Sequence, residues 1–249
     1  MKPRTIAIML IGATAIAIMA VMFVRMNARH QTSVDVDRAV YPVVGIDVSA
    51  HNGDIDWDKV AAAGVDFVYI KASEGATWRD ARFEENYRAA TAAGLNVGIY
   101  HFFRFDVEGW RQSVNILRAI NGRPLQMPIA IDLEEWSNPE AGTAEIVDQL
   151  RSLVELLHQA GREVVIYTNK NGYYRFLRGR FDDVGLWICS FSNPPLSRND
   201  GWLLWQHSHN GRVPGIRGEV DINTINTPAI GSFARYLSTA PAISRLSRR

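Results

Sequence analysis

Short apolar runs alternate with amphipathic stretches along most of the chain. The apolar runs have the length and the β-branched and aromatic content of strands, whereas the stretches between them repeat apolar residues at helical spacing. Strands are predicted near residues 43–48, 66–71, 97–103, 127–134, 163–168, 185–190, 202–207 and 219–223. Helices are predicted near residues 56–63, 80–93, 107–120 and 143–160. This alternation is typical of an α/β domain with a parallel sheet, and eight strands favour a barrel.

Glycine marks the junction between three of these helices and the strand that follows. The junctions are Ala63-Gly64, Ala93-Gly94 and Ala160-Gly161. Glycine at this position supplies the left-handed cap that turns the chain back toward the sheet. Beyond about residue 180 the helical signal fades, and loops that contain proline and glycine separate the last strands. We therefore predict an irregular, TIM-like β/α barrel with about eight strands and fewer helices.

The N-terminal region differs from the rest of the chain. No residue from Thr5 to Val24 is charged, and a helix of this length would span about 30 Å, roughly one bilayer core. Lys2 and Arg4 precede the run and Arg25 follows it without a clean small-residue cleavage site, so an uncleaved signal anchor is favoured over a cleaved signal peptide. The predicted divisions are a transmembrane segment at 1–24, a linker at 25–42, a barrel domain at 43–238 and a basic tail at 239–249.

Net charge, cysteine content and missing motifs each argue against particular classes of function. The chain has 27 basic and 26 acidic residues and a formal net charge of +1, which gives no electrostatic reason to expect nucleic acid as a partner. Cys189 is the only cysteine and lies in an apolar run, so a buried thiol is expected and an intramolecular disulfide is excluded. The sequence contains no zinc-type motif, nucleophile elbow or phosphate-binding glycine loop, so no metal and no cofactor are expected.

Four acidic residues are predicted at one rim of the barrel. Asp132 and Glu134 end the strand near 127–134 and, being two residues apart, point to the same face. Asp47 closes the first strand, and Asp221 lies in the last one. In β/α barrels the functional residues lie at the C-terminal ends of the strands. A carboxyl pair there can keep one acid protonated as a proton donor and the other ionised, which is the chemistry of glycosidases.

Aromatic residues are predicted at the same rim. They are Tyr100, Phe102, Trp136 and Trp205. Their flat apolar faces suit stacking on sugar rings. Filling of the core is an equally good interpretation of any single one of them.

Five ordered motifs resemble the family 25 glycoside hydrolases, the muramidase-type lysozymes. The first is Gly45-Ile46-Asp47-Val48-Ser49, followed by His51, Gly53 and Ile55-Asp56-Trp57. The others are Phe67-Val68-Tyr69-Ile70-Lys71-Ala72-Ser73-Glu74-Gly75, Gly98-Ile99-Tyr100-His101-Phe102, Ile131-Asp132-Leu133-Glu134, and Trp205-Gln206 with Val213-Pro214-Gly215-Ile216 and Val220-Asp221-Ile222-Asn223. The resemblance covers about residues 43–225, and a chance match of five ordered motifs is very rare.

The resemblance implies an enzyme that cuts the β-1,4 bond between N-acetylmuramic acid and N-acetylglucosamine in peptidoglycan. Carried over position by position, it makes Glu134 the proton donor with a raised pKa and Asp132 its ionised partner, with Asp47 and Asp221 as the other acids of the site. The residues expected to contact the substrate are Tyr100, Trp205, Gln206, Trp136, Glu74 and His101. Two positions depart from the family pattern, because His207 and Phe191 stand where tyrosine is common. The spacing of the acids fits either a retaining or an inverting mechanism.

Two alternatives stay open. One is a membrane-tethered module that binds peptidoglycan without cleaving it, although a pure binder has no need to cluster four acids against their repulsion. The other is a chitinase-like barrel glycosidase, whose usual strand motif has more alternating aspartates than 131–134 offers. The expected partners are peptidoglycan glycan strands and a membrane, through the N-terminal helix. We expect a monomeric catalytic domain that faces the periplasm or cell wall.

Overall fold

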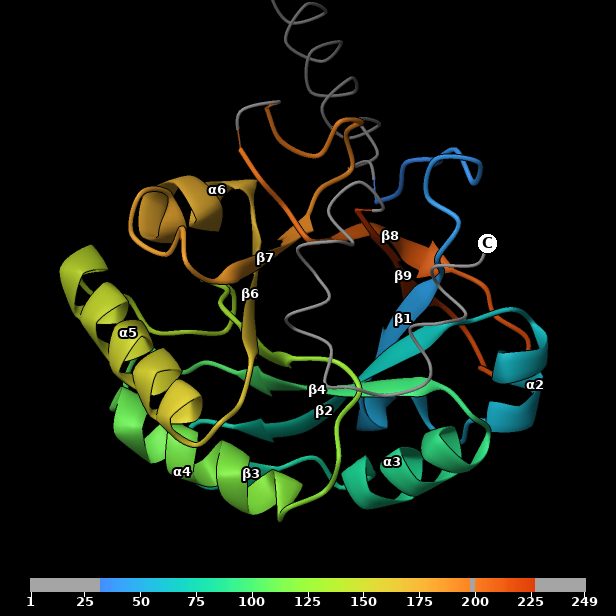
Figure 1. Cartoon of the computed structure of the whole chain (residues 1–249), viewed down its shortest axis with the longest axis horizontal. Coiled ribbons are helices and arrows are strands. Elements are labelled where there is room, and N and C mark those ends of the chain that lie inside the picture. Colours follow the sequence, from blue (N-terminus) through green and yellow to red (C-terminus); the bar gives the residue numbers. More distant parts are fainter. Residues whose placement is uncertain (1–31, 198–199, 227–249) are drawn as a thin grey trace, which may run out of the picture. The chain divides into compact units, whose positions relative to one another are not determined.

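Eight strands close into a barrel in the computed structural model of the chain, which describes residues 32–197 and 200–226 (Figure 1). The strands are β1 (Gly45–Val48), β2 (Phe67–Glu74), β4 (Asn96–Phe102), β5 (Ile129–Asp132), β6 (Val164–Asn169), β7 (Gly185–Cys189), β8 (Leu204–Gly211) and β9 (Val220–Ile225). Their order around the ring is β1-β9-β8-β7-β6-β5-β4-β2, and pairing of β1 with β2 closes it. A two-residue strand, β3 (Trp78–Arg79), pairs with the end of β2. The predicted eight-stranded barrel is therefore confirmed.

The last strand runs against its neighbours. Every other pairing in the ring is parallel, whereas β9 is antiparallel to both β8 and β1. The prediction of a parallel sheet is therefore wrong for this strand. The physical reason is the connection from β8, which contains no helix in the described residues, because a parallel partner needs a long crossover and an antiparallel one does not.

Helices cover the outside of the barrel. The predicted ones are found as α2 (Trp57–Ala62), α3 (Phe83–Ala92), α4 (Gly109–Ile120) and α5 (Thr143–Gln159). Two further helical stretches were not predicted. One follows β6 and comprises α6 (Lys170–Gly172) and a π-helical turn, η2 (Tyr173–Leu177), and the other is the 3-10 turn η1 (Ala50–Asn52). Gly64, Gly94 and Gly161 have φ angles of 83°, 81° and 71°, which confirms the left-handed turns predicted at these junctions.

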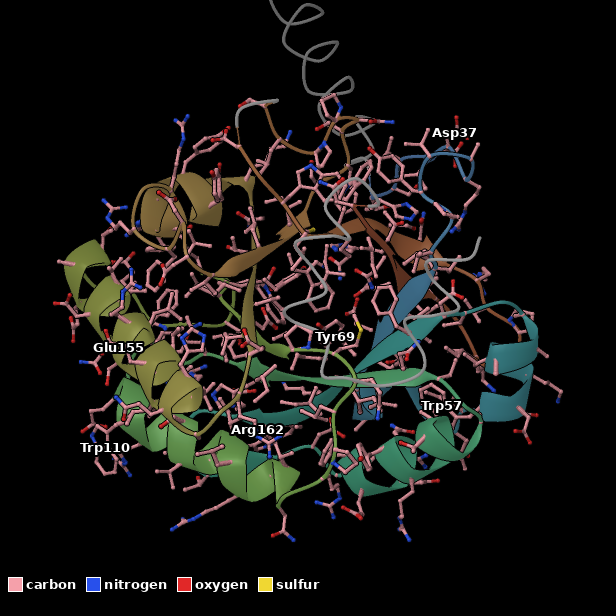
Figure 2. The ribbon with its side chains drawn as sticks, in the orientation of Figure 1. Asp37, Trp57, Tyr69, Trp110, Glu155 and Arg162 are labelled. Carbon is pink, nitrogen blue, oxygen red and sulfur yellow. The ribbon has the colours of Figure 1, made fainter. Side chains whose placement is uncertain are left out.

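Two apolar layers fill the structure, one inside the ring of strands and one between the ring and the helices. In Figure 2, Tyr69 lies within the ring, whereas Trp57, the first residue of α2, lies outside it. Large rings inside the barrel require small residues opposite them, since a Cβ atom on Gly45 would lie 2.0 Å from the ring of Phe67 and one on Gly98 would lie 2.6 Å from that of Tyr69. Aromatic side chains thus fill the interior below the level at which the strands end.

The segment before β1 packs on the barrel. The amide of Val34 donates to the carbonyl of His207 over 2.9 Å, and the amide of His209 donates to the carbonyl of Thr32 over 2.8 Å. The ring of Tyr41 lies 5.7 Å from that of Trp205. The barrel unit therefore begins at Thr32, earlier than the boundary expected at residue 43.

The expected transmembrane segment at 1–24 and the basic tail at 239–249 lie outside the described residues, as does the first part of the expected linker. Within residues 32–197 and 200–226, no helix combines the length and the apolar character needed to cross a bilayer.

Candidate active site

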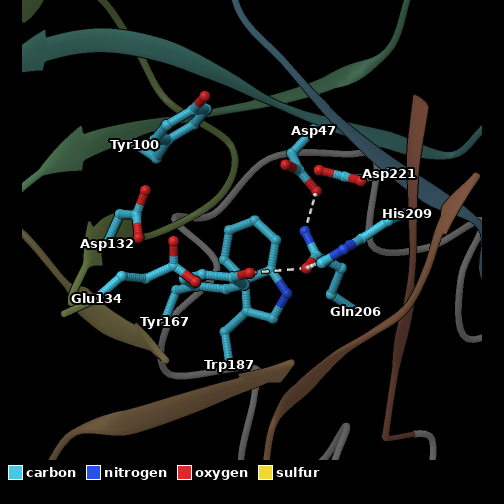
Figure 3. Close-up of a pocket in the computed structure, with 9 residues that line it drawn as sticks. All are labelled: Asp47, Tyr100, Asp132, Glu134, Tyr167, Trp187, Gln206, His209 and Asp221. Carbon is cyan, nitrogen blue, oxygen red and sulfur yellow. Dashed lines mark hydrogen bonds between the residues drawn. The ribbon is translucent and has the colours of Figure 1, made fainter. Parts of the chain in front are cut away.

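A pocket lies at the end of the barrel where the parallel strands finish (Figure 3). Its walls come from β1 and from every strand between β4 and β9 in the ring. The lining residues are Asp47, Tyr100, Asp132, Glu134, Tyr167, Trp187, Gln206, His209 and Asp221. All four predicted acids are therefore brought together, along with two of the six residues expected to contact substrate.

The carboxyl pair of Asp132 and Glu134 is presented by an extended stretch at the end of β5. Between them, Leu133 is fully buried on the opposite side of the strand. Its amide donates to the carbonyl of Tyr167 over 2.9 Å, and its carbonyl accepts from the Thr168 hydroxyl over 2.7 Å. These bonds to β6 hold the backbone extended past the last residue of β5. Both acids thus face the pocket, as the alternation of side chains along a strand predicts.

The pocket raises the pKa of both members of this pair. Burial raises the pKa of Glu134, the charge of Asp47 raises it further, and a hydrogen bond with Tyr167 opposes the rise. Burial also raises the pKa of Asp132 well above its usual range, with the charge of Glu134 adding to the effect and that of Lys71 opposing it. This direction opposes the ionised state expected of Asp132, which stays a prediction. The reason is its enclosure, since its Oδ1 atom is buried without a hydrogen-bond partner in the described residues.

Asp47 and Asp221 form a second pair across the pocket. They are directly opposite each other in the pairing of β1 with β9, so the reversed strand brings Asp221 to the rim near its beginning. Asp47 Oδ2 accepts hydrogen bonds from Gln206 Nε2 over 2.9 Å and from Asn223 Nδ2 over 2.7 Å. Burial, then the charge of Asp47 and a hydrogen bond with it, raise the pKa of Asp221 to about 9. Asp221 is therefore neutral at pH 7 and can donate its proton to the Asp47 carboxylate.

Aromatic side chains form the wall between the two pairs. The Tyr167 hydroxyl donates to Gln206 Oε1 over 2.7 Å, and Trp187 Nε1 donates to Asn223 Oδ1 over 3.0 Å. The rings of Tyr167 and Trp187 meet edge to face at 4.9 Å. Sequence reasoning missed Tyr167, Trp187 and His209. Alternation along β6 could have found Tyr167, because it follows the interior residue Val165 by two positions.

Trp205 does not line the pocket. Its side chain is fully buried, packs near Tyr41 and Trp202, and donates from Nε1 to the carbonyl of Ser190 over 2.7 Å. Its neighbour Gln206 faces the pocket, so Trp205 must point to the other side of β8. The structure therefore places Trp205 in the outer apolar layer.

His101 is also turned away from the pocket. It is fully buried, with Nδ1 2.8 Å from the Ser73 hydroxyl and Nε2 3.1 Å from Gln112 Oε1 in α4. Tyr100, the preceding residue, faces the pocket, and alternation again sends the next side chain outward. Its contacts are thus those of a structural residue between the barrel and α4.

Glu74 and Trp136 lie at the same end of the barrel without lining the pocket. Glu74 ends β2 and accepts a hydrogen bond from Lys71 Nζ over 3.0 Å. Trp136 is 78% exposed in the connection after β5. The substrate contacts expected of these two residues stay predictions.

A barrel whose rim carries half-buried carboxyl pairs beside aromatic walls has the architecture of a glycoside hydrolase. Comparison with known proteins agrees with this class, because the sequence profile described as "Glycosyl hydrolases family 25" matches residues 46–216. The chain belongs to glycosyl hydrolase family 25, which confirms the resemblance seen in its motifs.

Similar proteins share much of the chain. It is 32% identical over 214 residues to lysozyme M1 of Streptomyces globisporus, covering 80% of this chain and 71% of that protein. It is 31% identical over 179 residues to the autolytic lysozyme of Clostridium acetobutylicum, covering 72% of this chain and 54%, about half, of that relative. A solved family 25 glycosyl hydrolase from Bacillus anthracis matches with a TM-score of 0.72 at 28% identity, covering 80% of this chain and 94% of that one.

Proposed function

We propose that this chain is a peptidoglycan muramidase that hydrolyses the β-1,4 bond between N-acetylmuramic acid and N-acetylglucosamine. The observation that carries the proposal is the Asp132 and Glu134 pair, held side by side in a pocket with aromatic walls. Two of the similar proteins are named lysozymes, which supports this substrate over chitin.

Glu134 is the proposed general acid. Burial raises its pKa, which favours retention of the proton that it must donate, and its carboxyl group faces the pocket. In the proposed reaction the proton passes to the glycosidic oxygen as the bond from that oxygen to the anomeric carbon breaks. A water molecule then supplies the hydroxyl group at the anomeric carbon, and its proton returns to Glu134.

Asp132 is the proposed partner that stabilises positive charge near the anomeric carbon. While Glu134 holds its proton, it exerts no negative charge on Asp132, and Lys71 favours the ionised form of that group. The two carboxyl groups can therefore take opposite protonation states even though burial raises the pKa of both.

A fragment that begins at Thr32, the start of the barrel unit, allows a direct test. Peptidoglycan is digested with this fragment and with its Glu134→Gln variant, and the products are identified by mass spectrometry. We expect fragments with reducing N-acetylmuramic acid ends from the wild type and a rate at least ~100-fold lower from the variant.

The matched control is Glu135→Gln, because Glu135 is half-exposed and pairs with Arg175 outside the pocket. It should retain wild-type activity. Near-normal cleavage by Glu134→Gln would reject the assigned acid. Binding without cleavage by the wild type would favour the binding module, and cleavage of chitin alone would favour the chitinase-like alternative.

We also propose that residues 1–24 anchor the enzyme in a membrane with the barrel outside the cytoplasm. The absence of charge from Thr5 to Val24 supports this arrangement. A reporter fused after Arg249 that is active only in the cytoplasm would refute the orientation.

A further inference from the structure

His209 lines the pocket beside the Asp47 pair and has no role in the proposed reaction so far (Figure 3). Its Nε2 atom lies 2.8 Å from Gln206 Oε1, so the ring donates to that amide oxygen. The ring meets that of Phe191 edge to face at 4.7 Å, and the backbone of His209 is held by its amide, which donates to the Thr32 carbonyl. Gln206 and Phe191 thus fix the ring, and Thr32 fixes the backbone that carries it.

A bulge in β8 brings His209 to the pocket. Gln206 pairs with Asn223, and the next pair joins Ser208 to Ile222. Strand β8 therefore advances by two residues where β9 advances by one, which leaves one extra residue in β8. In a regular strand residues 206 and 209 would face opposite sides, whereas the extra residue puts them on the same side. The bulge therefore aims His209 at the amide that contacts Asp47.

Gln206 transmits this contact to the acid. Its Oε1 atom accepts from both Tyr167 and His209, and its Nε2 atom donates to Asp47 Oδ2. The Tyr167 hydroxyl can accept as well as donate, so the donor that fixes which end of the amide faces Asp47 is the His209 ring. A reversed amide would set its NH₂ group against that N–H and its oxygen against a carboxylate. The orientation of Gln206 thus depends on His209.

We propose that His209 is a positioning residue for hydrolysis, acting through Gln206 to hold a hydrogen-bond donor on the Asp47 carboxylate. This inference rests on the proposed muramidase function. The titratable groups around the ring are Cys189 of β7, whose Sγ lies 3.5 Å from Nε2, and Asp47 of β1, with Tyr167 and Asp221 farther along the same wall. Burial lowers the pKa of His209 and raises that of Cys189 to about 12, so both are neutral at pH 7.

The test uses His209→Phe, which keeps a ring against Phe191 but removes the donor. Loss of the donor loosens the Gln206 amide and raises the pKa of Asp47, since a hydrogen bond to a carboxylate favours the ionised form. We expect kcat to fall by about tenfold with KM within about twofold of wild type, and the acid limb of the pH profile to move to higher pH. His209→Gln, which restores an N–H donor of similar reach, should recover most of the activity.

His158→Phe is the matched control, because His158 is exposed in α5 and does not line the pocket. A second measurement follows the Asp47 carboxyl by NMR titration, which reads the positioning effect without any turnover. An Asp47 midpoint that rises in His209→Phe supports the inference. An unchanged midpoint overturns it, as does a loss of activity that tracks only a loss of thermal stability. Failure of the muramidase proposal shows separately, as a wild type that releases no fragments.

Discussion

Asp221 illustrates how a single residue in this pocket ties stability to pH. Its pKa is about 9 in the folded chain, against about 3.9 for an unfolded aspartate. Between about pH 4 and pH 9, the Asp221 carboxyl group therefore keeps its proton in the folded state and loses it in the unfolded state. The stability contributed by this proton is complete below about pH 4 and is lost as the pH rises toward 9.

Asp221→Asn should remove this pH dependence. Asparagine has the shape of the neutral acid and can still donate to Asp47, so the variant should fold. We expect the free energy of unfolding to fall less between pH 5 and pH 8 in Asp221→Asn than in the wild type, measured by urea denaturation at both values. Asp58→Asn, at an exposed position in the first turn of α2, serves as the control and should follow the wild type. Parallel pH dependence in wild type and Asp221→Asn would contradict the assigned protonation state.

At the scale of single residues, Asp47, Asp132 and Glu134 could be predicted because each lies at or near the end of an apolar run. Asp221 reaches the same rim for a different reason, since it lies near the beginning of the reversed strand β9. Trp205 and His101 were misplaced for one physical reason. Each is next to a residue that faces the pocket, and side chains alternate along a strand, so each points to the outside of the barrel. A sequence motif does not specify which of its side chains point inward and which point outward. His209 could not have been predicted to face the pocket, because its orientation depends on a bulge that leaves no clear mark in the sequence.

At the scale of elements, the helices and ring strands could be predicted to within a few residues because their apolar periodicity and glycine caps are strong. The direction of β9 could not be predicted, since it depends on how the loop after β8 folds. The short helical stretch from Lys170 to Leu177 also left no clear signal, because it is too short to show an amphipathic repeat.

One buried side chain in α4 joins that helix to the barrel. Gln112 is fully buried, and its Oε1 atom accepts from the Arg104 amide over 2.9 Å and lies 3.1 Å from His101 Nε2. Its Nε2 atom donates to the carbonyls of Arg104 over 2.9 Å and Val107 over 2.8 Å. The Gln112 side chain therefore provides hydrogen-bond partners for backbone groups of the connection between β4 and α4.

Gln112→Met should destabilise the chain by about 3 kcal/mol, because the substituted side chain fills the space but leaves several buried polar groups without partners. Urea denaturation measures the change. Gln159→Met, at the exposed last residue of α5, is the control and should cost less than about 0.5 kcal/mol. Equal effects of the two substitutions would show that the Gln112 contacts contribute little.

At the scale of the whole molecule, the barrel includes the segment before its first strand. Val34 packs against the outer apolar layer, and the backbone of this segment pairs with β8. This extension could not be predicted from the sequence, because residues 25–42 are mostly polar and lack periodicity. Its contacts with His207 and His209 place it next to the strand that contributes Gln206 to the pocket.

Removal of residues 32–41 should therefore lower both stability and activity. We expect a fragment that begins at residue 42 to be less stable than one that begins at Thr32 by about 2–3 kcal/mol, from lost burial of apolar side chains, as measured by thermal and urea denaturation. A matched pair of substitutions refines the test. Val34→Ser should cost about 1 kcal/mol, and Val40→Ser should cost much less because Val40 is 48% exposed. Equal stability of the two fragments would show that the segment adds nothing to the barrel.

The reversal of β9 also determines the end of the barrel at which the backbone leaves the last strand. The amide of Asn226, the last residue described, donates to the carbonyl of Leu203 over 2.9 Å, just before β8 begins. The backbone therefore leaves the barrel at the closed end, opposite the mouth of the pocket. A parallel last strand would have ended at the mouth of the pocket instead. For protein engineering, a reporter or a surface-immobilisation tag joined directly after Asn226 would therefore start on the face of the barrel opposite the pocket.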